Sequence, residues 1–307
     1  MAVYRRGVRD DACFTAPVLA SPHHGVHHVA GVAMTRLVRL FIFALLAVAA
    51  PFASAQSLPV QVGVQGNVAT VVIGPSAAPL ADMTLTFDSP HALTAANLGI
   101  SAQTVSLTDP QLLARLPGTL ASLDSSFPLM VTVEPPAGGL SFDRTVKVEI
   151  HTHALAYTYG SSYRLFKAPL GGAFRDITTE VAQGSVRARG TTGGFSQFLV
   201  LADVRRTGDV VDDKLERLRL RIATLPATEA APLEVQRAAA AQAVADARYD
   251  DALGALDALA ARVDDRAGTA IPNTWLAGGS GNNAAGDLLA GVATAKFSIA
   301  YLRNFGH

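Results

Sequence analysis

Two histidines near the end of an apolar strand pattern carry the clearest chemistry in the sequence. His151 and His153 stand two residues apart, and side chains two apart on a β-strand project from the same face. Both imidazoles could therefore reach one metal ion, and Glu149 would share that face as a third ligand. Such a set would suit a metal-binding protein or a metal-dependent hydrolase. A solvated strand end explains the same pattern, and the sequence favours this simpler interpretation.

Paired aspartates suggest acid and base chemistry, but their spacing is wrong for it. Asp250-Asp251 and Asp264-Asp265 bracket a helical pattern. Their separation is about 21 Å along a helix, which is far more than glycosidases use. We interpret Asp250 and Asp251 instead as residues that interact favourably with a helix dipole.

No serine nucleophile is identifiable, because the sequence has no Gly-x-Ser-x-Gly turn. The histidines that could act as its base after residue 55 are His91, His151, His153 and His307. Trp275, the sole tryptophan, could stack on a sugar, but we predict that it fills a core or the space between two domains. The sequence therefore predicts a protein that is not an enzyme and that holds no cofactor.

The N-terminal part of the chain contains a pattern typical of an export signal. Arg36 and Arg39 precede an apolar stretch over residues 40–50, which is too short to span a membrane. The small residues Ala53-Ser54-Ala55 suit a signal peptidase. We predict a signal peptide over residues 34–55 and a mature protein that is periplasmic or secreted.

Residues 1–33 lie ahead of this signal, and we predict that they stem from a gene start assigned too early. A His-His-x-x-His-His cluster that begins at His23 falls within them. Histidines alone fix no metal geometry, so we interpret this cluster as translated upstream sequence.

The composition after residue 55 excludes several classes of protein. The sole cysteine, Cys13, precedes the signal, so disulfides, thiol catalysis and a lipid-bearing cysteine are not expected. The mature chain has 20 Lys and Arg against 23 Asp and Glu, which leaves a net charge of −3. This balance argues against nucleic acid as a partner. We expect an unidentified protein or glycan partner and no membrane anchor after cleavage.

Residues 57–204 show the period-two alternation of β-strands. Val60, Val62 and Val64 alternate with other residues, and Gly66-Asn67 then indicates a turn. Apolar runs between turn signals predict about eight strands, at 60–64, 68–73, 83–87, 129–133, 146–150, 163–166, 186–188 and 195–201. A short helix is expected where Asp109 caps and Pro110 opens it. We predict an antiparallel β-sandwich.

The end of this half resembles immunoglobulin-like or ZU5-like modules of bacterial surface proteins. The resemblance covers Tyr163-Arg164-Leu165-Phe166, the segment from Phe174 to Thr178, and Phe195-Ser196-Gln197-Phe198. It implies an immunoglobulin-like fold and a structural or adhesive role, by analogy of fold.

A helical half at residues 209–303 follows a polar linker at 205–208. Val211, Leu215, Leu218 and Ile222 recur at helical spacing, and three further helices are expected. The second is predicted from Leu233, after Pro232, to about Ala247; the third carries an apolar stripe from Tyr249 to Val263; the last is capped by Asn283 and runs to Arg303. We predict a bundle of about four helices.

The helical half is similar to two known kinds of module. Residues 247–253 are similar to one helix of a tetratricopeptide unit, but no repeat of the required period is present. The tract from Tyr249 through Ile271 looks closer to small helical modules that end some secreted bacterial proteins. Taken whole, the chain resembles an uncharacterised family of exported proteobacterial proteins. The sequence thus predicts a non-enzymatic exported protein with a binding, adhesion or envelope-structural role.

Overall fold

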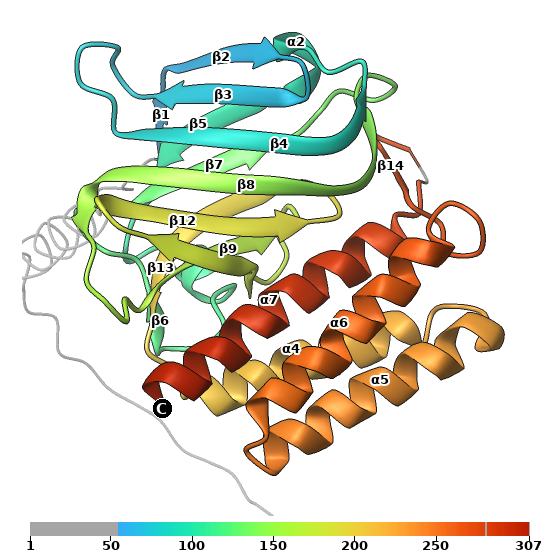
Figure 1. Ribbon diagram of the computed structural model, residues 1–307. Coiled ribbons are helices and arrows are strands. Elements are labelled where there is room, and N and C mark those ends of the chain that lie inside the picture. The colour runs from blue at the N-terminus through green and yellow to red at the C-terminus, as the bar shows by residue number, and fades with distance from the viewer. Residues whose placement is uncertain (1–54, 280, 307) are drawn as a thin grey trace, which may run out of the picture. The chain divides into compact units, whose positions relative to one another are not determined.

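The computed structural model describes residues 55–279 and 281–306 of the chain (Figure 1). The predictions for residues 1–33 and for the export signal up to residue 54 lie outside the described residues. Strands dominate as far as Asp203, and helices dominate after it. Antiparallel sheets followed by helices are therefore confirmed as the class of fold.

In the part of the chain that the structure describes, fourteen strands form two sheets in which every neighbouring pair is antiparallel. The first sheet has the order β1 (Gln56–Leu58), β5 (Ile100–Thr104), β7 (Leu129–Val133), β13 (Gln197–Asp203), β9 (Tyr163–Ala168) and β10 (Arg175–Asp176), and β6 (Ala121–Ser122) pairs with β13. The second has the order β11 (Thr178–Ala182), β12 (Ser185–Thr192), β8 (Ser141–Ala156), β4 (Ala81–His91), β3 (Val68–Ile73) and β2 (Val60–Gln65), and β14 (Thr274–Leu276) pairs with β8.

The two sheets share one hydrophobic core. On β4, Met83, Leu85 and Phe87 are fully buried while the residues between them are partly exposed, as the alternation of a half-buried strand requires. The same cluster includes Val131 and Phe198 from the first sheet. Each sheet therefore buries one face against this cluster, and the outward positions of β4 and β8 are left for polar side chains.

Two short helices connect strands of this half, α2 (Ala95–Leu98) and α3 (Pro110–Leu113). Asp109 caps α3 through a hydrogen bond from the amide of Gln111 to its side chain, and Pro110 begins the helix. The predicted start of this helix is confirmed, because a proline at the first helical position loses no hydrogen bond.

After the strands, the described residues form four longer helices, α4 (Thr207–Ile222), α5 (Ala227–Ala245), α6 (Tyr249–Arg266) and α7 (Ala284–Phe305). Their apolar faces form a second cluster that includes Leu215, Leu256 and Ile299. α7 packs on α4 and α6 and also contacts β8, β11 and β12, so it lies between the sheets and the other helices (Figure 1). No helix in the described ranges combines the length and the apolar character that a membrane span needs.

The predicted start of α5 at Leu233 is wrong. The helix begins at Ala227, and Pro232 lies inside it. Because Pro232 has no amide hydrogen, the helix lacks its bond to the carbonyl of Thr228. This loss falls near the N-terminus of the helix, where little of the helix precedes the proline and can be disturbed by it.

Residues Ala53–His307 form one compact unit. The segment predicted as a linker at 205–208 marks the change from strand to helix inside this unit, and α4 already begins at Thr207. β14, which follows α6 in the chain, pairs with β8, and Trp275 stacks on Phe142 with ring centroids 5.1 Å apart. The C-terminal half thus contributes a strand and an aromatic side chain to the β-rich half.

Candidate metal centre

Strand β8 places His151 and His153 on the same outward face, as the sequence predicts. The inward residues between and beside them, Ile150 and Thr152, are buried, so the alternation of the strand turns both imidazoles away from the core. On the neighbouring strand β4, Asp82 lies directly opposite His151 in the antiparallel register. Side chains directly opposite each other across two strands are close enough to interact.

These three side chains bring their ligand atoms into a small volume. Nε2 of His153 lies 3.0 Å from Oδ2 of Asp82, and Nδ1 of His151 lies 3.7 Å from the same oxygen. The imidazole centroids are 4.5 Å apart, and the three ligand atoms all lie within 4.8 Å of one another. In a tetrahedral zinc site, neighbouring ligand atoms lie roughly 3.3–3.6 Å apart. Small side-chain rotations would therefore bring all three onto one ion.

Ser185 on β12 holds His151 in the orientation that such a site needs. Nε2 of His151 lies 2.7 Å from Oγ of Ser185. When Nε2 carries the hydrogen and donates it to this hydroxyl, the lone pair is on Nδ1, which faces Asp82. Metal-binding histidines usually donate their second ring N–H to an oxygen in this way.

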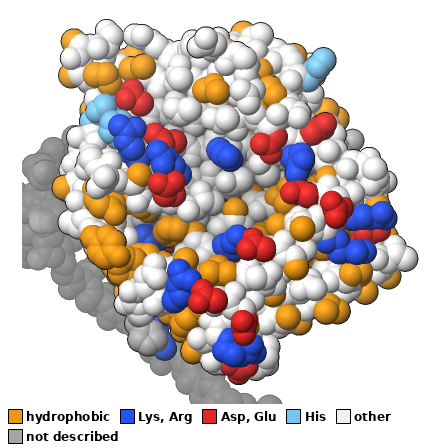
Figure 2. All heavy atoms as spheres, viewed as in Figure 1, with side chains coloured by type: hydrophobic (Ala, Val, Ile, Leu, Met, Phe, Trp, Pro, Cys, Tyr) orange, Lys and Arg blue, Asp and Glu red, His pale blue; other side chains and the backbone are white. Residues whose placement is uncertain are grey.

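The cluster is open to solvent and favours a neutral His151. The side chains of Asp82 and His153 are 43% and 39% exposed, and that of His151 is 16% exposed. Burial lowers the pKa of His151, and Arg187 and the neighbouring imidazole of His153 lower it further. The carboxylates of Asp82 and Glu149 act in the opposite direction. Figure 2 shows histidine side chains beside Lys or Arg and Asp or Glu groups on the surface above the helices. A neutral imidazole is the form that binds a metal ion.

Glu149 is not the third ligand of this cluster. It lies on the predicted face, but its carboxylate accepts hydrogen bonds from Arg187 and Arg189 on β12, at 3.1 Å and 2.5 Å. Burial alone would raise the pKa of Glu149, whereas these two arginines bring it below its ordinary value. The carboxylate of Glu149 is therefore neutralised by two guanidinium groups. Asp82 occupies the third ligand position that the sequence predicts for Glu149.

The donor set limits the kind of metal ion. Two imidazole nitrogens and one carboxylate oxygen suit Zn²⁺ and other divalent first-row transition metals, whereas Mg²⁺ and Ca²⁺ prefer oxygen ligands throughout. Three protein ligands also leave at least one coordination position for water. The cluster is thus suited to an exposed, exchangeable transition-metal ion.

Among the described residues, three of the four aspartates around α6 form ion pairs with arginines. Asp250 and Asp251 lie in the first turn of α6, as predicted, and pair with Arg303 and Arg248. Asp264 pairs with Arg144, which connects α6 to β8. These contacts agree with the structural interpretation of the pairs.

A comparison with protein-family models finds one match, a family of unknown function (DUF6689), over residues 43–303. No curated protein and no solved structure matches the chain significantly. The expected membership of an uncharacterised family is confirmed, and the likeness to immunoglobulin-like, ZU5-like and small helical modules stays a prediction.

Proposed function

The chain belongs to the family of unknown function DUF6689, and we propose that it is an exported protein that binds a divalent transition-metal ion without catalysing a reaction. The observation that carries this proposal is the convergence of Asp82, His151 and His153, whose ligand atoms lie within 4.8 Å of one another. The orienting hydrogen bond between His151 and Ser185 supports it.

The proposed location is the periplasm or the cell exterior. It rests on the pattern of Arg36 and Arg39, the apolar stretch at 40–50 and the small residues that end at Ala55. In these compartments the protein would act by binding, by adhesion or as part of the cell envelope. A metal ion held on an open sheet face suits such a role, because a partner can reach its free coordination position.

A metal-dependent hydrolase is the second candidate function. The free coordination position favours it, since a catalytic zinc ion binds water there and lowers the pKa of that water. Binding remains the first candidate because Asp82 and His153 are broadly exposed, whereas catalytic metal sites are shielded in shaped cavities.

We further propose an immunoglobulin-like sandwich for the two sheets and a four-helix bundle for α4–α7. The shared cluster between the sheets supports the first, and the common apolar cluster of the four helices supports the second. Both arrangements follow the rule that each element buries its apolar face against another layer.

Elemental analysis of residues 56–307, produced without a histidine tag, tests the metal site. We expect one transition-metal ion per chain, and zinc binding that His153→Ala and Asp82→Asn each weaken by about 100-fold or more. Even the loss of an outer-shell partner costs about 10–100-fold in metal affinity. His91→Ala is the matched control, since His91 is an exposed histidine on the same strand as Asp82 and lies outside the cluster.

Two results would end the proposal. Absence of stoichiometric metal together with no saturable zinc binding would remove the site. Equal weakening by His91→Ala and His153→Ala would indicate non-specific binding to exposed imidazoles. Hydrolysis of an ester, peptide or glycan panel that requires the bound metal would select the second candidate instead.

A further inference from the structure

A cleft of about 280 Å³ lies between the β-rich half and the helices, away from the metal cluster. Strands β9, β10 and β12 form one wall, and α4 and α7 form the other. Pockets for drug-sized ligands measure about 300–1,000 Å³, so this cleft suits a smaller molecule.

The cleft is strongly cationic although the mature chain carries a net negative charge. Five cationic side chains line it, namely Lys167, Arg175, Lys214, Arg217 and Arg221. Two carboxylates, those of Asp176 and Asp287, line it as well, which leaves an excess of three positive charges. A concave surface of one sign concentrates its field and attracts ions of the opposite sign.

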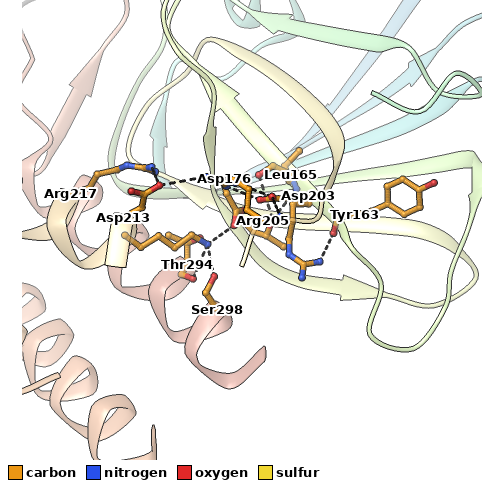
Figure 3. Close-up of polar contacts among 12 residues, drawn as sticks. Tyr163, Leu165, Asp176, Asp203, Arg205, Asp213, Arg217, Thr294 and Ser298 are labelled. Atoms are coloured by element: carbon orange, nitrogen blue, oxygen red, sulfur yellow. Dashed lines mark hydrogen bonds and ion pairs between the residues drawn. The ribbon is translucent and has the colours of Figure 1, made fainter. Parts of the chain in front are cut away.

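Two of these cations are already neutralised by carboxylates that line the cleft. Arg221 pairs with Asp287 at 3.0 Å and also donates to the side chain of Asn282. Nζ of Lys214 donates to Asp176 at 2.6 Å, and Thr294 and Ser298 of α7 accept further hydrogen bonds from it (Figure 3). Both members of the pair are almost fully buried. Lys214 therefore serves to join α4, α7 and β10, and the excess of three positive charges belongs to Lys167, Arg175 and Arg217.

The arginines of the cleft retain some free donor groups, including one on the paired Arg221. Arg217 reaches Asp213 only at 3.4 Å, and Arg205 competes for the same carboxylate oxygen (Figure 3). Arg175 is exposed and forms no ion pair within the part of the chain that the structure describes. The buried Nε of Arg221 finds no acceptor among the described residues. A bound oxyanion would satisfy these donors.

We propose that this cleft binds a small organic anion through a carboxylate or phosphate group. Arg175 from β10 and Arg217 from α4 flank the cleft from opposite walls, and a guanidinium binds such a group through paired hydrogen bonds. Leu218 and Ala290 supply apolar surface beside them for the rest of the ligand. The site is separate from Asp82, His151 and His153 and does not depend on metal binding.

Lys167 gives the site a pH dependence. Burial lowers the pKa of Lys167 to about 8, with Asp287 opposing and Arg175 reinforcing the shift. Its ammonium group already donates to Thr192 and Gly194, so it contributes charge to the cleft as long as it stays protonated. Anion binding should weaken as the pH rises through about 8.

Isothermal titration calorimetry tests the proposal. Residues 56–307 are titrated with sulfate and with succinate at neutral pH and constant ionic strength. We expect saturable binding of at least one of the two probes, weakened about tenfold or more by Arg175→Gln and by Arg217→Gln. The exposed Arg175 has no described partner to lose, so its replacement should leave the fold intact. Arg219→Gln is the control, because Arg219 lies on the same helix α4 and pairs with Glu216 outside the cleft.

Sulfate keeps its charge between neutral and alkaline pH, so a weaker binding above pH 8 would report the protein's own deprotonation. An equal effect of all three substitutions would mean general charge screening and would overturn the proposal. Absence of saturable binding of either probe would overturn it as well. Metal content is measured on the same variants. This measurement distinguishes a loss of anion binding from a loss of the metal site.

Discussion

At the residue scale, the histidines of the candidate metal centre were predictable and its carboxylate was not. The two-residue spacing of His151 and His153 fixes their common face once the strand is identified. Asp82 joins them through pairing between β4 and β8, about seventy positions apart in the chain, and no local pattern indicates that register. Glu149 has the expected orientation, but Arg187 and Arg189 arrive from a third strand and neutralise it.

The buried ion pair between Lys214 and Asp176 gives a stability test at the same scale. Lys214→Met leaves the carboxylate of Asp176 buried without its cation, and breaking such a pair costs about 3–5 kcal/mol. We expect a loss of that size in urea unfolding, and partial recovery when Asp176→Asn removes the stranded charge.

The control is Lys296→Met, which removes a lysine from the exposed pair with Asp257 on the helical surface. Exposed pairs contribute about 0–1 kcal/mol. If the two lysine substitutions destabilised the protein equally, the buried pair would not be a strong link between α4 and β10.

At the element scale, most of the longer strands and helices were predictable, whereas the five-residue strands β5 and β11 and the shortest strands were not. β3 matches its predicted range fully, and α3 and α7 begin at the predicted caps. The strands β1, β10 and β14 have only two or three residues, too few for a period to be visible. Such strands exist because a longer neighbour supplies their hydrogen bonds, and this information is tertiary.

The N-terminus of α7 connects the helices to the β-rich half through Asn283. Asn283 caps α7 by accepting from the amide of Gly286, and its own amide group donates to the carbonyls of Arg144 at 2.6 Å and Gly193 at 2.8 Å. Asn283→Ala removes the cap and leaves carbonyls without a donor. We expect a loss of about 2 kcal/mol or more in the free energy of unfolding.

The adjacent Asn282 provides the control for this substitution. It is exposed, and its side chain accepts a hydrogen bond from Arg221 on the surface. Asn282→Ala should change the free energy of unfolding by less than about 0.5 kcal/mol. Similar losses for both variants would show that the cap has no special part in docking α7.

At the scale of the whole molecule, the sequence suggests two domains because its period changes once, near residue 205. The structure shows why the change of period does not mark a gap. α7 packs against β8, β11 and β12, and residues Ala53–His307 form one compact unit. The spacing of apolar residues shows which face of a helix or strand is buried. It does not show which other element covers that face.

We therefore expect the chain to unfold in one cooperative transition. Trp275, the sole tryptophan, packs against Phe142 and Phe195, so its fluorescence reports the contact between the halves. Circular dichroism at helical wavelengths reports α4–α7. The two signals should give the same urea midpoint. Two separate midpoints would mean that each half folds by itself.

The pairing of β14 with β8 also bears on the order in which the protein can fold. The hydroxyl of Thr274 donates to Asp143 across 131 positions of the chain. A nascent polypeptide must therefore extend past Trp275 before its aromatic residues near Phe142 receive this neighbour. Contacts between such distant positions slow folding, so that side of the sheet stays unfinished until β14 has been synthesised.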